Sequence, residues 1–194
     1  MSFCVFSAAV KSGGAASFNL AVNGFVQSLE RPPLTVAMII ITRSVEWFVL
    51  VPATFLLLAL PKTRCPLGIP AAVVLTLSGV LNFLLKLLFA VPRPEIHRLA
   101  EVTADYAFPS GHSMTSAAFV CACAYLLLRF DFKPPAKFAI IAGAALWVMA
   151  VGISRVYLGV HNTADVLAGW VAGVFVCALV IIVTDALGFS YNES

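Results

Sequence analysis

Five apolar runs, separated by short segments that hold most of the charges, constrain this chain more than any other feature of its sequence. A transmembrane helix needs roughly 20 predominantly apolar residues. Of the 194 residues, 61% are hydrophobic and 11% are charged, whereas soluble domains carry roughly a quarter charged residues. The sequence therefore predicts an all-α integral membrane protein, a helical bundle of about five transmembrane helices at residues 45–60, 69–91, 109–128, 138–153 and 163–187.

The part of the chain before these runs has a different pattern. Within residues 1–33, apolar side chains from position 18 to position 29 recur at roughly helical spacing and alternate with Asn19, Asn23 and Gln27. This pattern predicts an amphipathic helix that lies in the membrane interface. We expect one domain over residues 1–194, because the length fits a single domain and no linker divides it.

Residues 45–187 are predicted to form the transmembrane core of the domain. Residues 34–42 precede this core and are expected to lie shallow or tilted in the membrane, because polar residues at positions 43, 44 and 46 interrupt the apolar run. Arg43 and Glu46 are spaced to pair on one helix face.

The positions of the basic loops predict the orientation in the membrane. Residues 62–64 and 129–137 are basic loops that five spans would place on one face, which the positive-inside rule makes cytoplasmic. Residues 93–112 and 155–161 would then lie on the extracytoplasmic face. The net charge of +3 is too small to favour nucleic acid as a partner.

One segment packs three ionisable residues, Arg155, His161 and Asp165, between two of the most apolar runs. If a helix begins near Asn162, His161 precedes its first turn and Asp165 follows one turn later, so the carboxylate can reach the imidazole. An oriented base or nucleophile has this geometry. Alternatively, Arg155 and Asp165 form an interfacial ion pair and His161 caps the helix.

Two further segments are expected on the same membrane face. Lys86 and Arg93 are seven residues apart, two helical turns, although a proline between them disturbs the helix; alternatively, they are cations that snorkel at a helix end. Ser110, Gly111 and His112 follow a proline at a predicted helix N-terminus, where backbone N–H groups favour an anion. By itself this second segment could be a plain helix cap.

Together the three segments place three cations, two of the three histidines and one oriented carboxylate on one face. They resemble the signature motifs of the type 2 phosphatidic acid phosphatase superfamily, which includes the vanadium-dependent haloperoxidases. The motif residues are Lys86-x6-Arg93-Pro94, Pro109-Ser110-Gly111-His112 and Ser154-Arg155-x5-His161-x3-Asp165. Residues 86–165 carry the resemblance, and residues before 45 match nothing diagnostic.

The resemblance implies a role for each motif residue. His161 would be the nucleophile, Asp165 would orient its imidazole, and His112 would be the general acid for the leaving oxygen. The phosphoryl oxygens would be held by Lys86, Arg93, Ser110, Gly111 and Arg155. Three cations can neutralise a phosphoryl group without Mg²⁺, so we expect neither a metal nor a cofactor.

The predicted function is a lipid phosphatase of the bacterial plasma membrane with an extracytoplasmic active site. Its substrate would be a lipid phosphate monoester or diphosphate, with undecaprenyl diphosphate, phosphatidylglycerophosphate and phosphatidic acid as the leading candidates. The alternatives are a vanadate-dependent peroxidase, a lipid phosphotransferase, and a transporter in which intramembrane charges line a path. The oligomeric state does not follow from the sequence.

Overall fold

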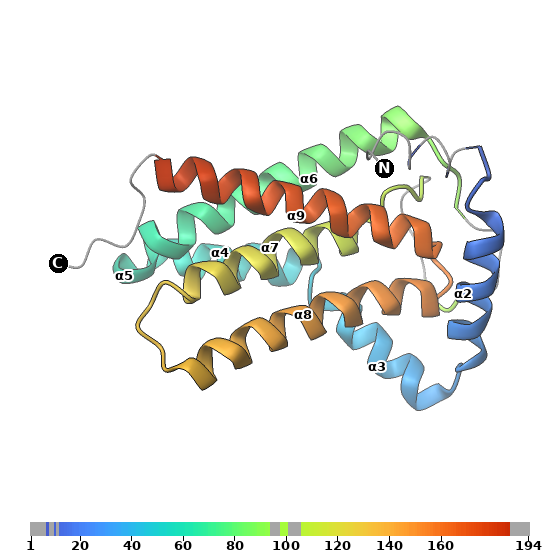
Figure 1. Cartoon of the computed structure of the whole chain (residues 1–194), viewed down its shortest axis with the longest axis horizontal. Helices are drawn as coiled ribbons and strands as arrows, with labels where there is room; N and C mark the ends of the chain where they lie inside the picture. The colour runs from blue at the N-terminus through green and yellow to red at the C-terminus, as the bar shows by residue number, and fades with distance from the viewer. Residues whose placement is uncertain (1–6, 8–9, 11, 94–97, 101–105, 187–194) are drawn as a thin grey trace.

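A computed structural model describes residues 7, 10, 12–93, 98–100 and 106–186 of the chain (Figure 1). Within these residues the regular structure is helical, apart from one isolated antiparallel bridge between Pro92 and Tyr106. The predicted all-α fold is therefore confirmed. In chain order the elements are α2 (Ala16–Ser28), α3 (Pro32–Arg43), α4 (Trp47–Ala59), α5 (Pro61–Thr63), the π-helical turn η1 (Arg64–Gly68), α6 (Ile69–Phe89), α7 (Gly111–Leu127), α8 (Pro134–Tyr157) and α9 (Thr163–Ala186).

Three helical segments are long and apolar enough to cross a membrane. They are Pro61–Phe89, which joins α5, η1 and α6, and the helices α8 and α9. The helix α7 is also apolar but has only 17 residues. These helices indicate an integral membrane protein, whereas the count of five spans stays a prediction. The helix α8 continues to Tyr157, so Ser154 and Arg155 lie in its last turns and not in the loop where we expected Arg155.

The helices α3 and α4 form a bent pair with an angle of 43° between them. Together they are apolar enough for one more span, which would be either broken or re-entrant. The hydroxyl group of Ser44 donates to the carbonyl oxygen of Ile41 at 2.7 Å, and Glu46 takes the extended backbone of a helix N-cap before α4. The prediction that Arg43 and Glu46 share one helix face is wrong, because the helix breaks between them.

The helix α9 packs closely against α7 through two glycines. A Cβ atom on Gly169 would lie 2.7 Å from the carbonyl oxygen of Ser110, and one on Gly173 would lie 2.3 Å from that of Met114. Small residues at this four-residue spacing let helix backbones approach closely inside a membrane. The backbone N–H of Ser110 also donates to the carbonyl oxygen of Asp165 at 3.0 Å. The two helix N-termini are therefore fixed relative to each other.

Apart from the break between α3 and α4, the connections between the labelled helices gather at two opposite ends of the bundle (Figure 1). The α8–α9 turn and the C-terminal end of α6 lie at one end, where α2 runs across the ends of α8 and α9. The helix α5 and the α7–α8 connection lie at the other end. This arrangement agrees with the predicted separation of the basic loops from the segments that carry the motifs.

Candidate active site

The turn between α8 and α9 presents His161. After Tyr157, Gly159 adopts a φ of +69°, a left-handed conformation that commonly follows the end of a helix and that glycine adopts without strain. The backbone N–H groups of Val160 and His161 then donate to the carbonyl oxygen of Arg155 at 3.2 and 3.3 Å. The turn is therefore tied to the last turns of α8, from which Arg155 also comes.

The carboxylate of Asp165 lies behind the ring of His161. The distance from Nδ1 of His161 to Oδ2 of Asp165 is 3.7 Å, and both side chains are buried. The same Oδ2 accepts a hydrogen bond of 2.8 Å from the backbone N–H of Asn162, which is half of a helix capping box. The carboxylate is thus fixed by the start of α9. A proton on Nδ1 would face it and leave Nε2 with the lone pair.

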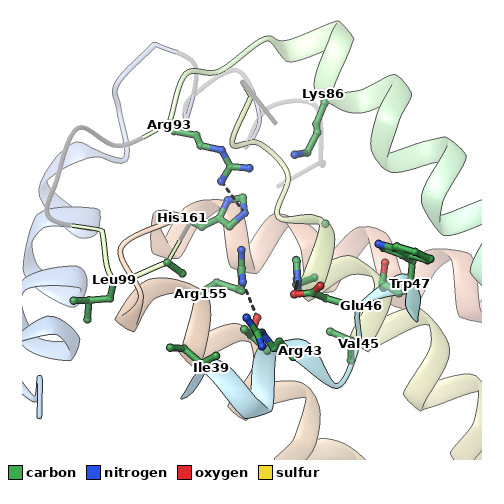
Figure 2. A pocket seen from close by; sticks show the side chains of 15 residues that line it. Ile39, Arg43, Val45, Glu46, Trp47, Lys86, Arg93, Leu99, Arg155 and His161 are labelled. Atoms are coloured by element: carbon green, nitrogen blue, oxygen red, sulfur yellow. Dashed lines mark hydrogen bonds and ion pairs between the residues drawn. The ribbon is translucent and has the colours of Figure 1, made fainter. Parts of the chain in front are cut away.

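The other ring nitrogen of His161 faces Arg93 (Figure 2). Nη1 of Arg93 lies 3.4 Å from Nε2 of His161 and donates a hydrogen bond of 2.7 Å to the carbonyl oxygen of Val160. Arg93 follows the end of α6, so this contact joins two of the predicted motifs. A guanidinium at this position would meet an anion attached to or approaching Nε2.

Two more cations line the same pocket. Nζ of Lys86, in the last turn of α6, donates to the carbonyl oxygen of Tyr106 at 2.9 Å. Nη1 of Arg155 donates to the hydroxyl oxygen of Thr42 at 2.7 Å. Backbone and hydroxyl oxygens hold these two cations, which leaves their positive charge uncompensated by those contacts. These contacts do not support the alternative in which Arg155 forms an ion pair with Asp165, because Arg155 binds Thr42 and Asp165 binds the backbone of Asn162.

The pocket has a volume of about 670 Å³. The helices α3, α4, α6, α7 and α8 and the loops beside them contribute to its wall, so residues far apart in the sequence meet here (Figure 2). The lining residues are Ile39, Thr42, Arg43, Val45, Glu46, Trp47, Lys86, Arg93, Leu99, Ala100, Gly111, His112, Thr115, Arg155 and His161. A strongly cationic pocket beside an uncharged imidazole suits a phosphate group.

The N-terminus of α7 contributes Gly111 and His112 to the pocket wall. Ser110 is at the N-cap position and is fully buried behind them; its hydroxyl oxygen accepts a hydrogen bond of 3.0 Å from Ser113. The backbone N–H of Ser110 is already bound to Asp165, as described above. We therefore expect the amide of Gly111, more than Ser110 itself, to be the group of this segment that meets an anion.

Two pocket residues were missed by the sequence analysis as members of the site. Oε1 of Glu46 lies 3.8 Å from Nε2 of His112, and Thr42 holds Arg155. Both come from the α3–α4 pair, outside the three motifs. The polar interruption at these positions was a visible signal, but the sequence alone did not indicate which helix the interruption would face.

The pKa of His161 is lowered well below the ordinary histidine value of 6.5. Burial of the ring is the largest cause, because it disfavours the charged form, and the nearby Arg155 and Arg93 lower the pKa further. The imidazole is therefore neutral near pH 7, so the lone pair on Nε2 remains available for attack on an electrophile.

Residues 94–97 and 101–105, which include Pro94 of the first motif, lie outside the described part of the chain. Among the described residues, no group of three or more His, Cys, Asp or Glu side chains is arranged to hold a metal ion. The structure thus brings together Lys86, Arg93, Gly111, His112, Arg155 and His161 around one pocket, with Ser110 and Asp165 buried behind it.

Residues 67–188 match the PAP2 superfamily, and the chain belongs to this superfamily. The resemblance inferred from the three motifs is therefore confirmed.

Among its relatives is phosphatidylglycerophosphatase B of Bacillus subtilis, 38% identical over 116 residues that cover 58% of this chain and 56% of the relative. The chain thus matches little more than half the length of this relative. An undecaprenyl-diphosphatase of Sulfolobus acidocaldarius is 29% identical, with 84% of this chain and 76% of the relative covered. The crystal structure of a transmembrane PAP2 type phosphatidylglycerolphosphate phosphatase from B. subtilis superimposes with a TM-score of 0.85 at 29% identity, covering 95% of this chain and 93% of that one.

Proposed function

We propose that this protein hydrolyses the phosphate monoester or diphosphate of a membrane lipid through a phosphohistidine intermediate. The observation that carries the proposal is the position of Nε2 of His161, which faces Arg93 in a pocket also lined by Lys86 and Arg155. The names of the relatives, phosphatidylglycerophosphatase B and undecaprenyl-diphosphatase, support phosphate release from a lipid.

In the first step, the lone pair on Nε2 of His161 forms a bond to phosphorus. The bond from phosphorus to the leaving oxygen breaks, and its electron pair goes to that oxygen, which His112 protonates. Asp165 stabilises the positive charge that develops on the imidazole. Lys86, Arg93, Arg155 and the amide of Gly111 would hold the phosphoryl oxygens, since stabilising their charge is the main task in phosphoryl transfer.

In the second step, water replaces the imidazole on phosphorus. The oxygen of water bonds to phosphorus while His112, now unprotonated, takes a proton from it. The nitrogen–phosphorus bond breaks, its electron pair returns to Nε2 of His161, and inorganic phosphate leaves. His112 ends the cycle in its starting protonation state. This scheme uses groups of the chain itself and water, so we propose that the reaction needs no metal ion and no cofactor.

We further propose that the site faces the extracytoplasmic side of a bacterial plasma membrane. The basic residue Lys62 belongs to α5, which lies at one end of the bundle together with the basic α7–α8 connection, whereas the α8–α9 turn and the end of α6, which carry site residues, lie at the other end (Figure 1). Basic loops favour the cytoplasmic face. A site near the opposite membrane surface would meet a lipid headgroup while the lipid tail stays in the bilayer.

The helix α2 would lie in the membrane interface at that face. Its side chains Phe18, Leu20 and Phe25 are 46%, 75% and 68% exposed, whereas Asn23 is 7% exposed and faces the bundle. A helix that turns polar groups inward and large apolar groups outward is poorly suited to water. Contact with lipid would take these outward apolar side chains out of water, and burial of apolar surface in the membrane interface is favourable.

The function is tested by measuring phosphate release from the purified protein in mixed micelles, in excess EDTA. The substrates are undecaprenyl diphosphate, phosphatidylglycerophosphate, phosphatidic acid and a soluble phosphate ester, with His161→Ala as the control for contaminating phosphatases. We expect EDTA-resistant turnover of at least one lipid that exceeds turnover of the soluble ester. Absence of turnover on all three lipids, or a strict need for added divalent ions, would contradict the proposal.

A further inference from the structure

Two asparagines of α2 cap the N-terminus of α9. Oδ1 of Asn23 accepts hydrogen bonds from the backbone N–H of Thr163 at 3.1 Å and from its hydroxyl group at 2.7 Å. Nδ2 of Asn23 donates to Oδ1 of Asn162 at 2.9 Å. One helical turn earlier in α2, Oδ1 of Asn19 accepts a hydrogen bond of 3.0 Å from the backbone N–H of Ala164.

These contacts supply hydrogen-bond partners for backbone N–H groups at the N-terminus of α9. The first N–H groups of a helix have no partner within the helix, and a side chain at the N-cap usually satisfies one of them. In α9, Thr163 and Ala164 receive their partners from a helix that is about 140 residues earlier in the sequence. The capped turn is also the one in which Asp165 binds the backbone of Asn162.

Further contacts hold α2 and the start of α3 against the end of α8. Nε2 of Gln27 donates to the carbonyl oxygen of Val156 at 3.2 Å, and the hydroxyl oxygen of Tyr157 accepts a hydrogen bond of 3.0 Å from the backbone N–H of Arg31. Asn19, Asn23 and Gln27 are four residues apart and so share one face of α2. This face of α2 therefore contacts both the C-terminal end of α8 and the N-terminal end of α9, the two helix ends on either side of the turn that carries His161.

We propose that Asn19 and Asn23 are positioning residues for the reaction, acting on His161 and Asp165 through the N-terminus of α9. Their contacts are with residues 162–164, directly between His161 and Asp165 in the sequence. The helix α2 also lies outside residues 67–188, which match the superfamily. The proposal assigns part of the geometry of the active site to this helix, and it rests on the proposed function.

The physical consequence concerns the rate of chemistry more than substrate binding. Loss of a cap would let the first turn of α9 fray and move the carboxylate of Asp165 relative to the imidazole of His161. Misplacement of a reacting group by about 1 Å can cost about 100-fold in rate. Lys86 and Arg155 are held by Tyr106 and Thr42, which belong to other parts of the chain, so phosphate binding should change less than the rate.

The test compares Asn19→Ala and Asn23→Ala with Asn23→Asp and Ser28→Ala in the full-length protein. Asn23→Asp keeps the oxygen that accepts from Thr163, and Ser28 is an exposed α2 residue whose hydroxyl group donates to the carbonyl oxygen of Phe25 in the same helix. We expect kcat to fall roughly 10-fold to 100-fold in both alanine variants with KM changed by less than about twofold. Asn23→Asp should recover most of the loss relative to Asn23→Ala, and Ser28→Ala should resemble the wild type.

Amide hydrogen exchange of the segment 158–166 gives a readout that needs no substrate. We expect faster exchange at Thr163 in Asn23→Ala and at Ala164 in Asn19→Ala, with wild-type exchange in Ser28→Ala. Faster exchange in a protein that hydrolyses none of the lipids would count against the proposed function and leave the caps themselves established. Unchanged exchange and unchanged kcat in both alanine variants would overturn the positioning role, as would a loss in Asn23→Ala that appears in KM alone.

Discussion

Oε1 of Glu46 lies 3.8 Å from Nε2 of His112, across the pocket wall formed by the break between α3 and α4. His112 stands in a pocket that also holds Lys86, Arg93 and Arg155, and a positive charge on its ring would be repelled by all three. The carboxylate of Glu46 opposes this repulsion. It can therefore stabilise the protonated ring that the proposed mechanism uses as an acid.

This relationship predicts that Glu46→Gln slows the hydrolysis of lipid monoesters more than the hydrolysis of lipid diphosphates. A lipid monoester loses an alkoxide, which must be protonated as it leaves. A lipid diphosphate loses a phosphate group, whose departure depends less on protonation. Loss of one general-acid contribution typically costs about 100-fold or more, and Glu46 acts only through His112, so we expect about a 10-fold fall in kcat for phosphatidic acid. The fall for undecaprenyl diphosphate should be smaller. An equal fall for both substrates in steady-state assays would show that Glu46 does not act through leaving-group protonation.

A second prediction concerns the protonation of His161. Its lowered pKa means that the folded protein keeps this ring neutral as the pH falls through 6.5, where an ordinary histidine takes up a proton. Nuclear magnetic resonance of protein labelled with ¹⁵N in histidine should therefore show a neutral His161 ring with its proton on Nδ1 at pH 6. The signal is assigned by its loss in His161→Ala. Titration of this ring at or above pH 6.5 would contradict the expected effect of burial and of the neighbouring cations.

The packing of α7 on α9 predicts a difference between two glycine variants. In Gly173→Ala, the new methyl group would overlap the carbonyl oxygen of Met114 and the Cβ atom of Ala117, so the helices must separate. We expect the variant to lose about 1–3 kcal/mol of stability, seen as a lower Tm in detergent. Gly143→Ala is the matched control because nothing lies within 4 Å of its Cβ position. Equal Tm values for the two variants would mean that the α7–α9 contact is looser than the structure indicates.

The proposed orientation in the membrane predicts which loops can be labelled from outside the cell. Single cysteines replace Ser28, at the end of the bundle that α2 crosses, and Lys133, in the basic connection before α8, in a background without the five native cysteines. A membrane-impermeant maleimide should label position 28 in intact cells and position 133 only after permeabilisation. The reverse pattern would place the active site on the cytoplasmic side.

Much of the helical architecture could be predicted because apolar runs and prolines mark helix ends in the sequence. The closeness of His161 and Asp165 also followed from their spacing at a helix start. These are local relationships, in which neighbouring residues determine the geometry.

The relationships that the sequence did not predict are those between distant segments. The meeting of Glu46 with His112 depends on the bend between α3 and α4, which a span prediction treats as one apolar run with polar interruptions. In α2, the spacing of Asn19 and Asn23 predicted a polar face, but the sequence did not tell whether water or the end of α9 would satisfy it. Only the packed bundle decides such contacts, because polar groups take whichever partner the tertiary structure brings near.

In the proposed mechanism, His161 carries the phosphoryl group between the two steps. Asp165→Asn bears on this role indirectly: it should keep a trace of activity, because an imidazole in a poorer tautomer can still attack. The corresponding change in serine-protease triads lowers kcat by about 10⁴, so we expect a loss of roughly 10² to 10⁴. His161→Ala should abolish turnover altogether, since it removes the nucleophile.

The most direct measurement is the recovery of protein-bound phosphate after an alkaline or rapid acid quench, with ³²P-labelled lipid diphosphate as substrate. His112→Ala should accumulate acid-labile, alkali-stable phosphate, because a phosphate leaving group can depart without full protonation while attack by water then lacks its base. Peptide mapping should place that phosphate on His161, and His161→Ala should carry none. Equal labelling of the two variants, or full activity in His161→Ala, would contradict the assignment of His161 as the nucleophile.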